Sequence, residues 1–316
     1  MLAKGRGPFM VENGKSPAES RAVPCFFPLP IMSHDSHASS TATGNIDTDK
    51  VIPREGWHVI HLFYHIDRAN WSMLSDEEQL EAKTDLTALI QEIRSTDSTQ
   101  LLAFSMVTPK ADIGFMLLTD DLHKANEFEK KITTSLGPDI LTPLYSYLSM
   151  TELSEYTTNE TQYGDQIIAE DGGERDSDEF NAKIEEFRTR MKKYNQDRLY
   201  PNMPDWQVFC FYNMSKRRNG NDNWFALDFE ERRRLMIGHA KTGRTYAGRV
   251  RQLITGSTGL DEAEWGVTLF AHNSQDIKEI VYEMRFDEAS ARFAEFGDFY
   301  IGLQVQLDEL FRRIGL

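Results

Sequence analysis

The chain has 316 residues, of which 35 are Lys or Arg and 50 are Asp or Glu, so its formal net charge is -15. This length allows one large domain or two moderate ones, and the acidic balance disfavours nucleic acid as a partner, because phosphate binding needs a basic surface. Its two cysteines, Cys25 and Cys210, do not support a disulfide framework or a thiolate zinc site. No apolar run is long enough to span a membrane and no secretory signal is evident, so we expect a cytoplasmic protein.

The first elements in chain order are a disordered extension and a set of alternating strands and helices. Residues 1–48 are rich in Ser, Pro, Gly and Thr without periodicity, which is typical of a disordered segment. The first ordered half, residues 49–155, has the order β-α-β-β-α-β. Apolar periodicity, Ser75 as a helix cap and bounding turn residues predict these elements at 56–66, 74–94, 100–108, 112–119, 121–137 and 144–153.

The second half, residues 201–316, repeats this order after a polar linker and helix at 156–200, in which we expect 171–177 to be mobile. Its elements are predicted at 205–214, 227–248, 250–257, 265–272, 274–296 and 297–306, with 274–296 as one long helix. Trp57 aligns with Trp206 and Gly114 with Gly266 at nearly the same offset, which indicates an internal duplication. We therefore expect an α+β fold in which two ferredoxin-like βαββαβ units form one dimeric α+β barrel.

His239 is the candidate metal ligand. It follows Leu235 at the i, i+4 spacing of one helix face, and small Gly238 and Ala240 beside it leave room for a flat ligand. A lone histidine is more often structural than functional, and no second histidine lies at zinc-ligand spacing. One neutral imidazole is nevertheless sufficient for haem iron.

Four stretches of the second half carry a family pattern: FYNMSKRR at 211–218, NWFALDFEERRRLMIGHAKTGRTYAG at 223–248, RQLITGSTGLDEAEWGVTLF at 251–270 and VYEMRFDEASARFAEFGDFYIG at 281–302. Together they resemble the chlorite dismutase superfamily, and specifically its coproheme decarboxylase branch. The resemblance covers residues 55–316 and is thin in the first half. It implies a homopentamer whose subunits each bind iron coproporphyrin III and use hydrogen peroxide to decarboxylate two propionates, giving haem b. The resemblance also suggests a transient contact with coproporphyrin ferrochelatase. The sequence does not decide whether this contact forms.

The resemblance assigns roles by position. His239 becomes the proximal iron ligand, Tyr212 the redox tyrosine and Lys216 the partner of a reacting propionate. Gln252 matches the distal position over the iron. The remaining matched positions line the pocket, hold propionates or supply nearby aromatics: Arg198, Met214, Trp224, Trp265, Arg285 and Ser290.

Chemistry supports the same assignment of Tyr212 and Lys216. Simple loss of CO2 from a propionate leaves an unstabilised carbanion, so an oxidant has to remove a hydrogen from the β-carbon first, and a tyrosyl radical can do this. Lys216 lies four residues after Tyr212, so both share a face if the strand continues, and its ammonium can hold the carboxylate. We expect Arg217 and Arg218 to form only a solvated turn.

Gln252 separates the alternatives that remain. Chlorite-degrading relatives have an arginine at this position, and a neutral amide lacks the charge that retains an anionic oxidant. Arg249 and Arg251 are expected on the opposite face of the strand. Haem synthesis is therefore favoured, with a haem peroxidase or chlorite dismutase-like enzyme, or a non-catalytic haem carrier, as the alternatives.

Overall fold

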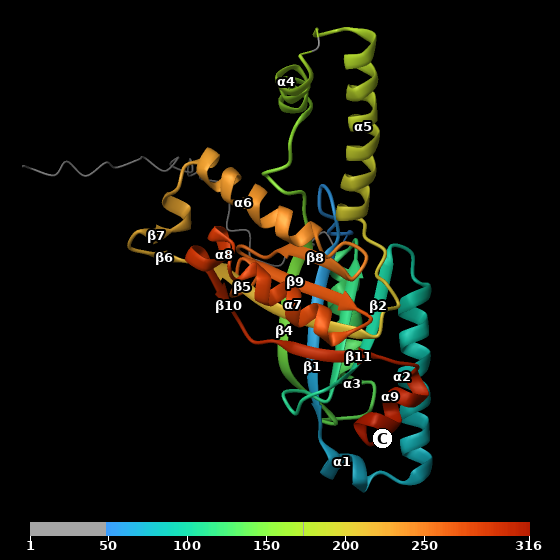
Figure 1. The fold of residues 1–316 in the computed structure, drawn as a ribbon. Coiled ribbons are helices and arrows are strands. Elements are labelled where there is room, and N and C mark those ends of the chain that lie inside the picture. The colour runs from blue at the N-terminus through green and yellow to red at the C-terminus, as the bar shows by residue number, and fades with distance from the viewer. Residues whose placement is uncertain (1–48, 173) are drawn as a thin grey trace, which may run out of the picture. The chain divides into compact units, whose positions relative to one another are not determined.

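A computed structural model describes residues 49–172 and 174–316 of the chain (Figure 1). The disorder predicted for residues 1–48, and Cys25 with it, lies outside the described residues. Within the described part, Cys210 is buried as a free thiol, and no helix is long and apolar enough to span a bilayer.

The first half forms the expected order of strands and helices, with one additional short helix, α1 (Arg68–Met73), after the first strand. Ser75 accepts a hydrogen bond from Glu78 N while the Glu78 carboxylate accepts from Ser75 N, so a complete capping box starts the long helix at the predicted place. The elements of this half are β1 (His58–Ile66), α1 (Arg68–Met73), α2 (Asp76–Ser95), β2 (Thr99–Met106), β3 (Ile113–Thr119), α3 (Leu122–Thr134) and β4 (Leu141–Thr151).

The second half repeats this order with a short hairpin and extra helices inserted. Its elements are β5 (Val208–Lys216), β6 (Arg218–Asn219), β7 (Asp222–Asn223), the 3-10 helix η1 (Trp224–Ala226), α6 (Phe229–Arg244), β8 (Val250–Gly256), β9 (Trp265–Ala271), α7 (Ser274–Met284), α8 (Glu288–Phe293), β10 (Ala294–Phe296), β11 (Tyr300–Gln304) and α9 (Leu307–Ile314).

The strands of both halves close into one barrel. The first half pairs its strands in the order β2-β3-β1-β4, and the second in the equivalent order β8-β9-β5-β11. Gly114 lies opposite Phe63 between β1 and β3, and Gly266 lies opposite Asn213 between β5 and β9, which agrees with the alignment of the halves. Because β4 also pairs with β8 and β11 with β2, the two sheets join at both edges, and the predicted dimeric α+β barrel is confirmed.

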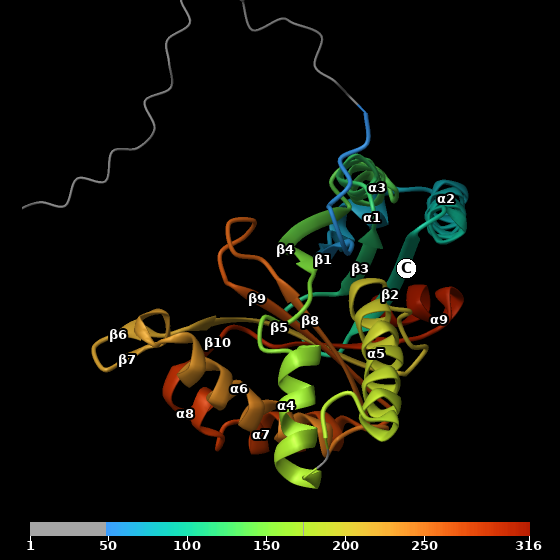
Figure 2. The same ribbon diagram turned by 90° about the horizontal axis from the view of Figure 1, so that it is seen from above.

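Buried apolar side chains form three clusters, one inside the barrel and one on each of its two outer faces. Residues of both halves fill its interior, where Phe104 stacks on Phe209 with ring centroids 3.9 Å apart. On the outside, α2, α3 and α9 cover the first half, whereas α7 covers the second and α6 packs against α7 and α8, and these helices flank the strands on opposite sides (Figure 2). The two outer faces differ in packing: α2 buries Leu86, Ile90 and Ile93, but α6 buries only Leu235 and Gly243.

The long helix predicted at 274–296 is wrong, since the segment divides into α7, α8 and β10. Arg285 ends α7, and Asp287 takes an extended conformation and caps α8 by accepting a hydrogen bond from Ser290 N at 3.0 Å. An aspartate side chain that bonds to the backbone three residues later favours a helix start over a continuing helix. This interruption sets the geometry of the site below.

The segment predicted as a linker contains a second helix, α4 (Glu160–Asp171), beside the expected α5 (Asp178–Leu199) (Figures 1 and 2). Asn159 and Gln162 form a capping box that starts α4. The helices share a small apolar cluster that includes Ile167, Phe180 and Ile184. The polar composition concealed this pair, although the capping pattern and the spacing of the apolar residues were visible in the sequence.

Candidate functional site

Three predicted site residues lie along one face of β5. The strand continues through Lys216, so Tyr212, Met214 and Lys216 alternate onto the same outer face of the barrel. Met214 lies opposite Trp265 on β9 and opposite Phe296 on β10, which brings the predicted aromatic Trp265 to this face. A tyrosine and a lysine therefore flank a methionine on a rigid strand.

Lys216 is a buried ammonium. Its side chain contacts the predicted aromatic Trp224, with Nζ 4.5 Å from the ring centroid, and Nζ donates to the carbonyl oxygen of Ala289 at 3.4 Å. Burial lowers the pKa of Lys216 to about 8, against the opposing charge of Asp287. Lys216 is 6% exposed and forms no ion pair with any carboxylate among the described residues, so its charge is available to a bound acid.

Tyr212 lies in an aromatic enclosure. Its ring stacks on Phe299 at 4.5 Å and lies 5.7 Å from Phe296, and the side chain is 7% exposed. Burial raises the pKa of the phenol and the nearby Cys210 thiol adds to this, whereas the charge of Arg285 lowers it. The phenol therefore stays protonated at neutral pH, so it can be oxidised only if its proton leaves with the electron.

His239 forms a hydrogen-bonded set with α8. Its Nδ1 lies 3.0 Å from Asp287 Oδ2 and 3.4 Å from Ser290 Oγ, so the helix that holds the histidine meets the cap of the next helix. Burial raises the pKa of Asp287, but hydrogen bonds from His239 and Ser290 outweigh this effect and lower it. The ionised carboxylate accepts Nδ1–H, which leaves the lone pair on Nε2 available to a metal.

Gln252 joins the same region from β8. Its Nε2 donates to the carbonyl oxygen of Gly243 at 3.4 Å, four residues beyond His239 on α6. Arg251 follows the predicted alternation, but the prediction for Arg249 is wrong because β8 begins after it. The Arg249 guanidinium forms ion pairs with Asp276 and Glu279 of α7 at 2.9 and 3.1 Å.

The remaining predicted arginines lie at the margins of this set. Arg285 ends α7 with its guanidinium 5.0 Å from the Phe296 ring, close enough to influence Tyr212. Arg198, at the end of α5, donates to the Glu152 carbonyl oxygen at 2.8 Å. No hydrogen bond or ion pair between described residues links Arg198 to Tyr212, Lys216 or His239.

The basic cluster after Tyr212 is more ordered than predicted. Arg218 forms an ion pair with the buried Glu264 and stacks over Phe225, so it is not merely a solvated turn residue. The same Glu264 carboxylate accepts a hydrogen bond from Lys216 N at 3.0 Å. Glu264 therefore fixes the end of β5 and with it the backbone position from which the Lys216 side chain extends.

The equivalent face of the first half has no such chemistry. There Leu62, Tyr64 and Ile66 take the places of Tyr212, Met214 and Lys216, and all three belong to a packed apolar cluster under the helices. The first half therefore has the isoleucine Ile66 where the second half has the buried Lys216.

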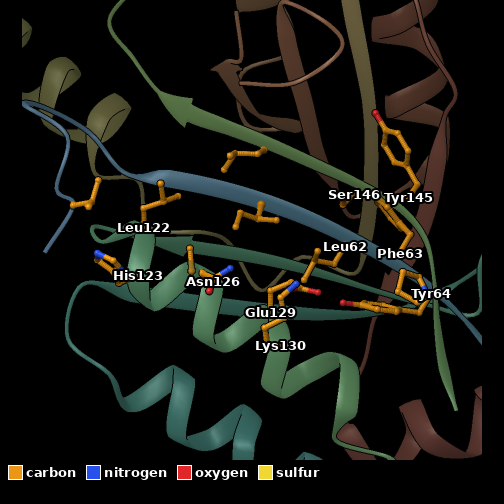
Figure 3. A pocket seen from close by; sticks show the side chains of 15 residues that line it. Leu62, Phe63, Tyr64, Leu122, His123, Asn126, Glu129, Lys130, Tyr145 and Ser146 are labelled. Atoms are coloured by element: carbon orange, nitrogen blue, oxygen red, sulfur yellow. The ribbon is translucent and has the colours of Figure 1, made fainter. Parts of the chain in front are cut away.

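A cavity of about 560 Å³ lies in the first half, between α3 and the strands β1 and β4 (Figure 3). Its floor includes Ile60, Leu62 and Leu148, and α3 contributes His123, Asn126 and Glu129 to the lining. The residues predicted for iron and propionate binding are absent from this lining, so we do not assign the site here.

The second-half residues fit an iron porphyrin. No group of three or more His, Cys, Asp or Glu side chains gathers as a metal site within the described residues, so a multi-ligand zinc-type site is not supported there. His239 instead offers one oriented imidazole, and Lys216 offers an unpaired charge for a propionate. Beside the histidine, a Cβ added to Gly238 would meet no atom within 4 Å, so the helix surface there is open to a flat ligand.

A model of the chlorite dismutase family matches residues 79–305, most of the chain. The protein belongs to the chlorite dismutase family. A solved haem-binding protein from Thermus thermophilus is 35% identical, with a TM-score of 0.69, and the match covers 83% of this chain and 96% of that one.

More distant members of the chlorite dismutase family share the fold. The enzyme from Candidatus Nitrospira defluvii, solved in complex with imidazole, is 16% identical with a TM-score of 0.62, over 84% of this chain and 97% of that one. A mutant of the same enzyme gives the same identity and TM-score. At this identity the likeness supports the barrel architecture and nothing finer.

Asp287 is the site residue that sequence reasoning missed. It stands inside the segment predicted as one continuous helix, where an aspartate suggests only a solvated position. Asp287 followed by Ser290 is nevertheless a cap pattern, and such a cap would have indicated a carboxylate at the start of a new helix.

Proposed function

We propose that this chlorite dismutase family protein is a coproheme decarboxylase. It would bind iron coproporphyrin III and use hydrogen peroxide to convert two propionates to vinyl groups, with haem b as the product. The arrangement that carries this proposal is Tyr212 and the buried, unpaired Lys216 on one face of β5, with Lys216 in contact with α8, whose cap residue Asp287 bonds His239.

His239 would hold the iron of the substrate through Nε2. Asp287 accepts the Nδ1 proton, which fixes the tautomer and makes the imidazole a stronger donor. Haem binding by the relative that is 35% identical supports a porphyrin ligand for this chain. The iron of the bound substrate would be the group that reacts with peroxide.

Lys216 would hold the carboxylate of the reacting propionate. Burial makes its charge costly, and a bound carboxylate offsets this cost. Tyr212 lies four residues earlier on the same strand face, and flexible lysine and propionate chains span such a separation. The pair therefore binds the acid at one end and presents a phenol to its β-carbon.

Tyr212 would act as a radical that takes one hydrogen atom from the propionate β-carbon. Loss of CO2 and of one further electron then leaves the vinyl group. Each propionate and peroxide, with one proton, gives one vinyl group, one CO2 and two waters, so two peroxides are required per porphyrin. The aromatic enclosure of Tyr212 excludes water from the radical.

Gln252 supports decarboxylation over chlorite breakdown. An amide offers no positive charge to retain an anionic oxidant, and Arg249 nearby is held by Asp276 and Glu279 on α7. Neutral peroxide does not need such a charge.

Mass spectrometry of the porphyrin tests the proposal. Purified protein is loaded with iron coproporphyrin III, peroxide is added in steps, and product masses are followed. We expect two successive decarboxylations in the wild type. Tyr212→Phe is expected to bind the porphyrin with unchanged affinity and to lose conversion, whereas Tyr194→Phe on the surface of α5 is the matched control and keeps full conversion.

Other products would indicate other functions. Bleaching of the porphyrin without decarboxylation indicates a peroxidase, oxygen release from chlorite a chlorite dismutase, and an unchanged ligand a haem carrier. Normal turnover by Tyr212→Phe would remove the radical role from this residue.

A further inference from the structure

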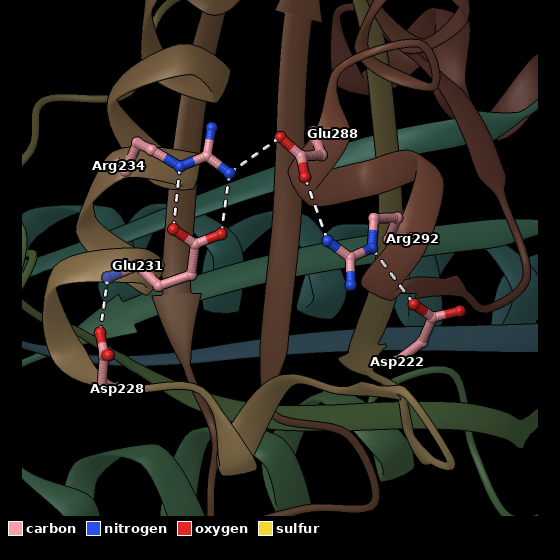
Figure 4. A network of polar contacts seen from close by, with 6 residues as sticks. All are labelled: Asp222, Asp228, Glu231, Arg234, Glu288 and Arg292. Carbon is pink, nitrogen blue, oxygen red and sulfur yellow. Dashed lines mark hydrogen bonds and ion pairs between the residues drawn. The ribbon is translucent and has the colours of Figure 1, made fainter.

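A chain of ion pairs joins α6, α8 and β7 on the surface above the site (Figure 4). Arg234 on α6 binds Glu231 with two hydrogen bonds of 2.9 and 2.8 Å and reaches Glu288 on α8 at 2.9 Å. The other Glu288 oxygen accepts from Arg292 at 3.1 Å, and Arg292 donates to Asp222 on β7 at 3.2 Å. The central pair, Arg234 and Glu288, therefore links two helices that are separate in the sequence.

This ion pair lies directly beside the histidine–aspartate contact. Glu288 follows Asp287 in the chain, and Arg234 stands on the same helix as His239, five residues earlier. The first residues of α8 thus meet α6 at two points: one is the Asp287–His239 hydrogen bond of 3.0 Å and the other the Glu288–Arg234 pair of 2.9 Å.

Apolar packing below the ion pairs connects the same helices to Lys216. Leu235, the residue after Arg234, and Ala289, the residue after Glu288, belong to one apolar cluster with Trp224 and Phe293. Lys216 Nζ contacts both Trp224 and the Ala289 carbonyl oxygen. A shift of α8 relative to α6 would therefore move the imidazole's partner and the surroundings of the ammonium together.

We propose that Arg234 and Glu288 are positioning residues for the Asp287–His239 pair. The inference rests on the proposed function, in that His239 ligates iron. α8 is 6 residues long, and its apolar side is packed through Ala289 and Phe293. On its polar side, the Glu288–Arg234 pair is a second contact with α6 beside the Asp287–His239 hydrogen bond, and it holds the carboxylate oxygen in line with Nδ1. Both partners are about half exposed, so salt weakens the pair and with it the alignment.

The iron–imidazole stretching band of the ferrous porphyrin-loaded protein, measured by resonance Raman spectroscopy, reports this alignment. A hydrogen bond that Nδ1–H donates to a carboxylate strengthens the iron–imidazole bond, so Asp287→Asn, which replaces the carboxylate, gives the reference downshift of the band. We expect Arg234→Met and Glu288→Gln to shift the band in the same direction by a smaller amount, and Arg234→Lys to restore it. Arg312→Met removes a surface pair with Glu309 on α9 and is the matched control.

Salt provides an independent test on unmodified protein. Raising NaCl from about 0.05 M to about 1 M screens exposed ion pairs. The wild-type band should therefore move toward the position of the Arg234→Met band, and the Arg234→Met band should not move with salt.

Three results would overturn the positioning role. The first is that Arg234→Met and Glu288→Gln keep the wild-type band while Asp287→Asn shifts it. The second is an equal shift in Arg312→Met, and the third is that Arg234→Met responds to salt as the wild type does. Retention of the band in His239→Ala would instead show that His239 is not the ligand. That outcome contradicts the proposed function and is distinct from failure of the positioning role.

Discussion

At the scale of single residues, burial sets the chemistry of the site. The same outer face of β5 that keeps the Tyr212 phenol protonated lowers the pKa of Lys216 to about 8. Burial disfavours the charged form of each side chain, so it stabilises a neutral phenol and destabilises an ammonium. A lysine in this condition binds a carboxylate more favourably than a surface lysine does, because the ligand supplies the counter-charge that the protein omits.

The lowered pKa of Lys216 predicts how porphyrin affinity depends on pH. Iron coproporphyrin should bind with constant affinity up to about pH 8 and more weakly above it, because the empty site then loses its proton. Lys216→Arg stays charged, so its affinity should not fall in this range, and Lys216→Met should bind weakly at every pH. Absorbance titrations measure the dissociation constants.

The difference between the pH profiles of porphyrin affinity in wild type and in Lys216→Arg separates the effect of this lysine from that of other titrating groups. If their pH profiles run parallel, the ammonium does not hold the substrate carboxylate. The sign for folding is opposite: the penalty for a buried charge is present below about pH 8 and disappears as the pH rises toward the unfolded value of 10.5.

At the scale of elements, the interruption between α7 and α8 builds the partner of His239. Asp287 both caps α8 and accepts a hydrogen bond from the imidazole, with one carboxylate oxygen for each task. The cap stabilises the fold in the absence of ligand, whereas the imidazole contact affects how strongly His239 would bind iron in the proposed function. Substitutions can separate the two tasks.

We expect Asp287→Ala to lower the free energy of unfolding of the ligand-free protein by about 1 kcal/mol, the usual cost of losing an N-cap. Asp287→Ser should recover most of this loss, because serine caps well, but its shorter side chain should not restore the iron–imidazole band. Urea denaturation gives the stability. Equal destabilisation by both variants would contradict the capping role.

Most of the elements could be predicted from sequence because their signals are local. Strand alternation located β1, β5 and β9, and the serine cap located the start of α2. Asp287 was missed because the apolar spacing of 274–296 continues across the break, so periodicity alone gave one helix. The Arg234–Glu288 ion pair was also inaccessible, because it depends on how α6 and α8 meet in space.

At the scale of the whole molecule, the two halves share one interior. Phe104 of the first half stacks on Phe209 of the second at 3.9 Å, and His61 of the first stacks on Phe211 of the second at 3.9 Å. Neither half encloses this core alone, since the barrel needs the seams between β4 and β8 and between β11 and β2. We therefore expect the barrel to unfold as one cooperative unit.

Phe209→Ala tests this coupling. The ring is fully buried, and its removal should lower the free energy of unfolding by about 3–5 kcal/mol, the usual cost for a buried phenylalanine. Urea unfolding followed by hydrogen exchange should show protection of β1 and β9 declining together. Loss of protection in the second half alone would show that the halves fold separately. The exposed Phe286→Ala serves as the control and should change stability little.

The break after α7 also limits how the proposed activity could be transferred to the other half. In the first half, α3 leads to β4 without a second capped helix. Grafting a histidine, a tyrosine and a lysine onto that half would leave the new imidazole without a carboxylate to orient it. An engineered second centre would need an inserted Asp-capped turn as well as the three side chains, so the two repeats are not interchangeable as scaffolds for the proposed site.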